Sequence, residues 1–108
     1  MRLRRRGPFD ELVERQLSLF VDDERELLLE ADEAESAWIR SDRESAEEAY
    51  GDFQLVVDAI ADRLVEVRDT YARTLADDKA DEYRRAFAAG VKRRLGRYPS
   101  VVSDVEST

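Results

Sequence analysis

The stretch that decides the fold of this chain runs from residue 46 to residue 74 and reads AEEAYGDFQLVVDAIADRLVEVRDTYART. Residues taken from this stretch in alternating steps of four and three lie along one line of a helix, which we call a seam. All of them except the last are apolar. This spacing is typical of an α-helix that packs along a second helix in coiled-coil fashion. The members of the seam are Ala46, Tyr50, Phe53, Val57, Ile60, Leu64, Val67, Tyr71 and Thr74.

A matching seam precedes it, and the two together predict a helical hairpin. No proline occurs between Phe9 and Tyr98, and good helix formers dominate. We predict helices over residues 9–40 and 42–76, joined by a tight turn and packed antiparallel, each about 50 Å long. The first seam contains Val13, Leu17, Phe20, Glu24, Leu27, Ala31, Ala34 and Trp38.

Local signals set the ends of these helices and predict a shorter third one. Pro8 and the capping-box pattern from Ser41 to Glu44 mark two helix starts. The third helix covers 79–95 and ends at Gly96. At about 25 Å it can cover only half of the hairpin, namely 57–76 and the first half of the first helix.

The expected fold is therefore all-α: a long antiparallel helical hairpin plus a shorter third helix. We divide the chain into a flexible basic arm over residues 1–8, a single helical domain over 9–98 and a flexible tail over 99–108.

The half of the hairpin near the turn is expected to stay uncovered and to expose apolar side chains. Such a patch usually marks a partner surface, and a two-fold homodimer that forms a four-helix bundle is the simplest solution. Another helical protein could use the same patch, and a monomer with scattered exposed aliphatic residues is the remaining alternative. The interface residues that we predict are Leu28, Leu29, Trp38, Ile39, Tyr50, Phe53, Leu55 and Val56.

The charge distribution argues against a nucleic-acid partner. The net charge of the chain is −8, and the stretch from Asp10 to Glu82 holds 24 acidic and 8 basic residues. Such a body repels phosphate backbones. The sequence also shows no apolar run of the roughly 18 residues that a membrane span needs, so we expect a cytoplasmic protein without nucleic-acid or membrane partners.

An acidic ridge follows the outer side of the second helix. We interpret it chiefly as a solvated face that aids solubility, while a basic partner protein or loosely bound divalent cations stay open as alternatives. Its members are Glu44, Glu48, Asp52, Asp58, Asp62, Glu66 and Asp69.

A metal-dependent enzyme is the alternative interpretation of this sequence. The chain has no cysteine and no histidine, so neither thiolate nor imidazole can bind a metal or act as a base. The segments from Glu30 to Glu33 and from Glu48 to Asp52 resemble the metal motifs of the MazG-like all-α nucleotide pyrophosphohydrolases. That resemblance implies Mg²⁺ held by Glu30, Glu33, Glu48 and Asp52 and a nucleoside triphosphate substrate.

The chain departs from the MazG-like pattern at two positions. Leu29 and Ala49 stand where that family has glutamates. On the helical frame, Glu33, Glu48 and Asp52 also lie off the seam, so a single hairpin is not expected to bring them together. We therefore expect a non-enzymatic interaction module without a cofactor.

Two residues leave the course of the helices open. Glu24 interrupts the first seam, so it is either buried beside a cation such as Arg63 or Arg68, or turned outward by a local break in the helix. Gly51 costs about 1 kcal/mol in a helix interior, so it marks either a bend or a close helix approach.

Overall fold

Five α-helices and no strand make up the part of the chain that the structure, a computed structural model, describes, residues 7–108. The all-α prediction is confirmed, but the prediction of three helices is wrong. The first six residues of the predicted basic arm lie outside the described part. The helices are α1 (Asp10–Asp23), α2 (Arg25–Arg40), α3 (Ala46–Ala72), α4 (Asp77–Leu95) and α5 (Pro99–Ser107).

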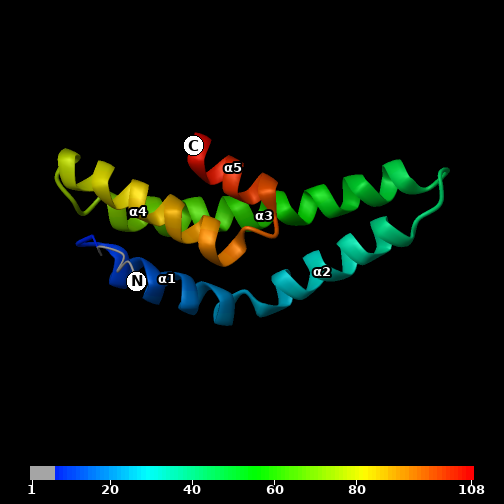
Figure 1. Cartoon of the computed structure of the whole chain (residues 1–108), viewed down its shortest axis with the longest axis horizontal. Helices are drawn as coiled ribbons and strands as arrows, with labels where there is room; N and C mark the ends of the chain where they lie inside the picture. Colours follow the sequence, from blue (N-terminus) through cyan, green and yellow to red (C-terminus); the bar gives the residue numbers. More distant parts are fainter. Residues whose placement is uncertain (1–6) are drawn as a thin grey trace, which may run out of the picture.

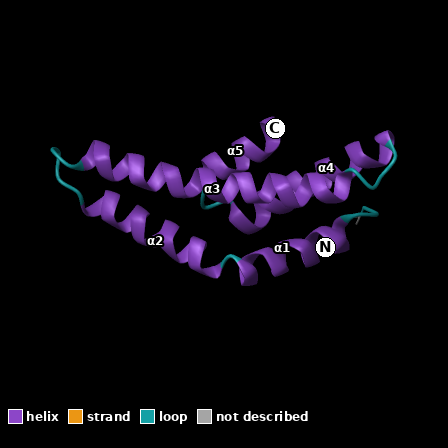
Figure 2. Cartoon of the chain, turned by 180° about the vertical axis from the view of Figure 1, so that it is seen from behind, coloured by secondary structure: helices purple, strands orange, loops and turns teal. Residues whose placement is uncertain are grey.

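The predicted hairpin exists only over α2 and α3, which pack antiparallel on either side of the turn at residues 41–45 (Figure 1). In the other half of the molecule, away from that turn, α1 packs chiefly against α4. The helix α5 packs across α3 and α4. Seen from either side, the α2–α3 end extends past the corner where α4 meets α5 (Figure 2). The described part measures 50 × 37 × 24 Å along its principal axes.

The first predicted helix, 9–40, is broken at Glu24, so its continuity is corrected. Glu24 has φ −105° and ψ 27°, outside the helical region, and separates α1 from α2. Its backbone stays satisfied, because its N–H donates to the carbonyl of Phe20 and its own carbonyl accepts from Leu28. The side chain turns partly outward and pairs with Arg63 of α3. The break thus swings α1 away from α3, and one of the two predicted cations still meets the carboxylate.

Glycine at position 90 lets α4 enter the space that this break opens. A Cβ atom placed on Gly90 would lie 2.6 Å from Val13 Cγ1 and 2.9 Å from Leu17 Cδ1, closer than real Cβ contacts. Val13 and Leu17 are fully buried in the core, so neither can move aside cheaply. The close helix approach that we considered for Gly51 is therefore absent there and is found instead at Gly90, in the pairing of α1 with α4.

The turn between α2 and α3 is capped differently from the prediction. The Ser41 hydroxyl donates back to the carbonyl of Trp38, and the carboxylate of Asp42 accepts the N–H and the hydroxyl of Ser45. These two hydrogen bonds hold the pKa of Asp42 below its usual value. The prediction of a capping box that begins at Ser41 is therefore wrong. From Ala46, α3 runs without a break through Gly51, near which an added Cβ would meet no atom within 4 Å.

The segment 99–108, predicted as a flexible tail, is instead largely the helix α5. Pro99 stands in the first turn, where its fixed φ and missing N–H cost nothing. Val101 and Val105 are fully buried, and the carbonyl of Val105 accepts a hydrogen bond from Arg68 Nη1 at 3.0 Å. Arg68, which is 4% exposed, is therefore a partner of α5 rather than of Glu24.

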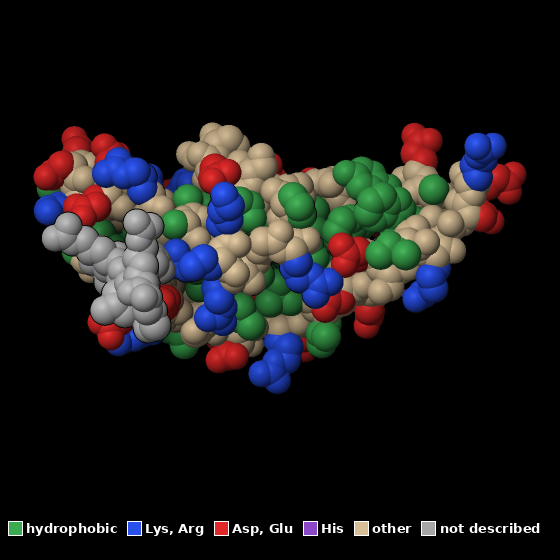
Figure 3. Space-filling model, in the orientation of Figure 1, with side chains coloured by type: hydrophobic (Ala, Val, Ile, Leu, Met, Phe, Trp, Pro, Cys, Tyr) green, Lys and Arg blue, Asp and Glu red, His purple; other side chains and the backbone are tan. Residues whose placement is uncertain are grey.

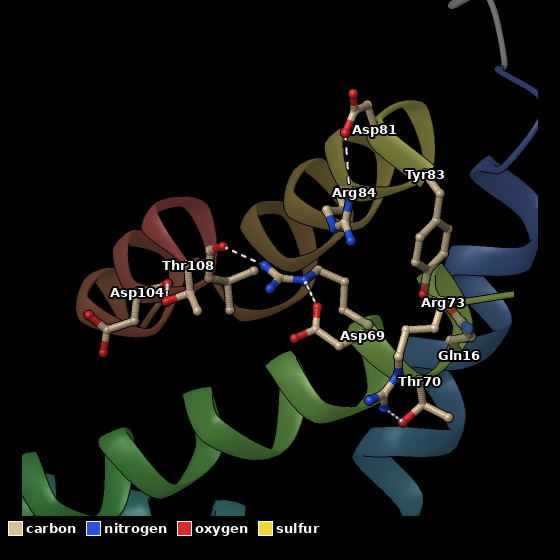
Figure 4. Close-up of polar contacts among 11 residues, drawn as sticks. Gln16, Asp69, Thr70, Arg73, Asp81, Tyr83, Arg84, Asp104 and Thr108 are labelled. Carbon is tan, nitrogen blue, oxygen red and sulfur yellow. Dashed lines mark hydrogen bonds and ion pairs between the residues drawn. The ribbon is translucent and has the colours of Figure 1, made fainter. Parts of the chain in front are cut away.

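Tyr83 joins α4 to α1 at the buried centre of the other half of the molecule. Its ring is inaccessible to solvent, and its hydroxyl donates to Gln16 Oε1 at 2.8 Å (Figure 4). Burial disfavours the charged phenolate and raises the pKa of Tyr83 to about 12.

This pKa predicts a loss of stability in alkali. An unfolded tyrosine ionises near pH 10, so the stabilisation by neutral Tyr83 is complete below pH 10 and is lost as the pH rises from 10 to about 12. Two pKa units correspond to about 2–3 kcal/mol. We expect the free energy of unfolding, measured in urea, to fall over this range, and to fall less in Tyr83→Phe. A slope unchanged by that substitution would contradict the assignment.

Candidate protein-interaction site

The hairpin end is the part of the fold that α4 and α5 leave open. We call residues 36–52, on both sides of the turn, the tip. The corner between α4 and α5 reaches only as far as Phe53, whose ring centre lies 6.3 Å from that of Tyr98. Past this point apolar side chains gather on the surface of the α2–α3 half (Figure 3).

A row of aromatic rings leads from the core onto this surface. Trp38 stacks on Phe53 at 5.9 Å between ring centres, and it meets Tyr50 edge-on at 4.8 Å. Such contacts fix the ring positions before any partner arrives. Ile39 is 72% exposed and Tyr50 45% exposed. We call Trp38, Ile39 and Tyr50 the tip patch.

Two carboxylates beside the tip patch, those of Asp32 and Glu35, are already paired within the chain. Arg97 Nη2 lies 2.9 Å from Glu35 Oε1 and 3.1 Å from Asp32 Oδ1, and the Tyr98 hydroxyl also donates to Asp32. The hydrogen bond to Glu35 raises the pKa of Arg97. Burial, followed by the contact with Asp32, raises the pKa of Tyr98. Ile39 follows Glu35 by four residues, so it shares the face on which Arg97 offsets one of these two negative charges.

The eight predicted interface residues do not form one surface. Phe53 and Val56 are only 8% and 9% exposed, and Leu28 is half-buried against the core, so these three serve largely as core. Trp38 is half-buried and joins the core to the tip patch. Leu29 and Leu55 are exposed. Leu55 lines a groove with Val56 on the side of the hairpin away from Tyr98, and Leu29 precedes Glu33 of the same groove by one turn.

That groove, of about 490 Å³, also collects three of the four carboxylates of the metal reading. Glu30, Glu33 and Asp52 line it together with Ala37 and Ala49, whereas Glu48 does not. Of the three acids that one hairpin was not expected to bring together, Glu33 and Asp52 thus border one groove, whereas Glu48 stays outside it. Within residues 7–108, however, no group of three or more carboxylates lies close enough to hold a metal ion.

Two more hollows lie along the junction of α1 and α2 with α3. The larger, about 690 Å³, has Phe20, Val67 and Tyr71 among its lining residues and is bordered by the ion pair of Glu24 with Arg63. The second, about 580 Å³, lies at the break between α1 and α2 and includes Leu27 and Glu30. Sequence reasoning missed both, because they exist only where the break separates α1 from α3.

None of the helices within residues 7–108 is both long enough and apolar enough to cross a membrane. Comparison of the chain with family models, with curated proteins and with solved structures finds no match.

Proposed function

We propose that this protein is a non-enzymatic interaction module that forms a two-fold homodimer through the tip patch. The observation that carries the proposal is the aromatic row that continues past Tyr98 into solvent, where no helix of the same chain within residues 7–108 covers Tyr50 and Ile39. Rigid aromatic and aliphatic side chains of this kind are the usual anchors of protein interfaces.

Charge favours a second copy as the occupant of this patch. In a two-fold interface each patch meets itself, so unpaired like charges would repel. Asp32 and Glu35 share the guanidinium of Arg97 of their own chain, so these three groups leave this face only one net negative charge to set against its copy. On the opposite face Glu30, Glu33 and Asp52 have no such partner among the described residues and would oppose their own copies.

The test is the mass of the protein in solution. Light scattering is expected to give twice the 12.5 kDa of one chain. Tyr50→Glu combined with Ile39→Glu places four carboxylates in the dimer interface and should weaken self-association about thirtyfold or more. Both side chains are exposed, so the variant should keep the helical circular dichroism of the parent.

Leu55→Glu is the control, because it adds one carboxylate at an exposed leucine on the other face. It should leave the dimer intact. A wild-type protein that stays at 12.5 kDa at high micromolar concentration, or a dimer that survives the double substitution, contradicts the proposal.

A second candidate function is a divergent Mg²⁺-dependent nucleoside triphosphate pyrophosphohydrolase. The groove that gathers Glu30, Glu33 and Asp52 is the observation in its favour. Release of pyrophosphate from a mixed nucleotide panel that requires Mg²⁺ and disappears in Asp52→Asn would replace the interaction module by this enzyme.

A further inference from the structure

The three hollows described above lie in a row, which we call the furrow, and no residue of α4 or α5 lines any of them. The two hollows nearest α1 share Glu24 and Arg63, and the two nearest the tip share Glu30. The furrow follows α1 and α2 on one side and α3 on the other, from Thr74 to Ala49. A groove between two helices is a surface that a further helix can fill.

The furrow has an apolar floor. The residues of the core or its edge that line it come from α1, α2 and α3, with three in the hollow along α1, Leu27 alone at the break and two in the hollow nearest the tip. Leu19 of α1 lies beside it and is 56% exposed, although a neighbouring hollow places it next to Phe20 and Val67. The apolar residues of the floor are Phe20, Leu27, Ala34, Val56, Val67 and Tyr71.

The walls of the furrow are strongly acidic. Eight carboxylates and only two guanidinium groups line its three hollows, and one of the guanidinium groups, that of Arg63, already neutralises Glu24. Within residues 7–108 the other seven carboxylates form no ion pair. They are Asp22, Asp23, Glu26, Glu30, Glu33, Asp52 and Glu66.

We infer that the furrow binds a basic amphipathic α-helix of another protein. An apolar stripe of that helix would lie on the floor, and lysine or arginine side chains on both sides of the stripe would meet the acidic walls. The wall charges are inconsistent with a second copy of this chain in the same orientation, because its furrow would bring equal charge. None of the residues that line the furrow belongs to the tip patch.

A designed peptide tests the inference without a known partner. The probe is a fluorescein-labelled 20-residue peptide with leucines every three or four positions and lysines on both flanks, and its control has the same composition in scrambled order. By fluorescence anisotropy we expect the patterned peptide to bind about tenfold more tightly than the scrambled one, and binding to weaken as salt rises. Amide shift changes in α1, α2 and α3 should accompany binding.

Two matched variants locate the site. Glu30→Gln with Glu66→Gln removes two wall charges and should weaken peptide binding about fivefold. Ser103→Lys with Glu106→Gln changes the net charge by the same amount at exposed positions on α5 and should leave binding unchanged.

Equal affinity for the two peptides, shift changes confined to α4 and α5, or equal effects of the two variants would each overturn the inference. Loss of self-association in Glu30→Gln with Glu66→Gln would also overturn it, because a second copy would then be the occupant. The dimer through the tip patch is tested separately, by the mass in solution of the variant with Tyr50→Glu and Ile39→Glu, and that test does not depend on peptide binding.

Discussion

Removing residues 99–108 is expected to destabilise the protein by about 4 kcal/mol or more. The truncation deletes α5 and returns the buried side chains of Val101 and Val105 to water, each worth about 1.5–3 kcal/mol. It also uncovers the surfaces of α3 and α4 on which α5 packs and takes away the carbonyl that Arg68 uses. Since a small domain is stable by only about 5–15 kcal/mol, the loss should be visible in any unfolding curve.

Urea denaturation followed by circular dichroism measures this loss. Deleting only Ser107 and Thr108, which are exposed, is the control and should leave the unfolding midpoint nearly unchanged. An unfolding midpoint of the longer truncation equal to that of the intact chain would show that residues 99–108 are a dispensable tail rather than part of the core.

Substitution of Gly90 is expected to be the most damaging single change in the helices. In Gly90→Val the Cβ atom alone would come within 2.6 Å of Val13 and 2.9 Å of Leu17, and the added methyl groups would force α4 away from α1. Overpacking of this kind costs about 1–3 kcal/mol, and the valine fills the tightest contact between two helices. We expect the free energy of unfolding to fall by about 3 kcal/mol.

Gly51→Ala is the matched control, because both glycines lie inside helices. Near Gly51 an added Cβ meets no atom within 4 Å, so alanine removes only the conformational cost of glycine. The free energy of unfolding should rise by about 0.5–1 kcal/mol. The two substitutions should therefore have opposite signs in the same denaturation assay. A common sign would mean that helix propensity, rather than the contact of α1 with α4, decides the effect.

Sequence periodicity predicted the pairing of α2 with α3 because both seams are read from local spacing. Ala31, Phe53, Val57, Ile60 and Leu64 lie in the core as the seam requires. The same reasoning placed α1 against α3, which is wrong, because a seam shows which face of a helix is buried but not which other helix covers that face. Val13 and Leu17 are buried as expected, yet they face Gly90 of α4.

The site was predictable only in part. Exposure of Leu29, Ile39, Tyr50 and Leu55 follows from the shortness of the third helix, which the sequence makes plain. The division of these four residues between two faces of the hairpin does not follow from the sequence, because it depends on the side from which α4 and α5 approach the hairpin. The pairing of Arg97 with Glu35 spans 62 residues and has no local signal.

By itself, then, the sequence determined the helical class and the apolar faces, and the lack of proline within α3 allows that helix to run unbroken. These are local properties, set by side chains a few residues apart. Only the tertiary structure decided that the chain breaks at Glu24, that α4 enters the opening and that α5 closes one face while the furrow stays open on the other. These outcomes depend on competition among distant surfaces for the same buried area, and no short-range spacing encodes the result of that competition.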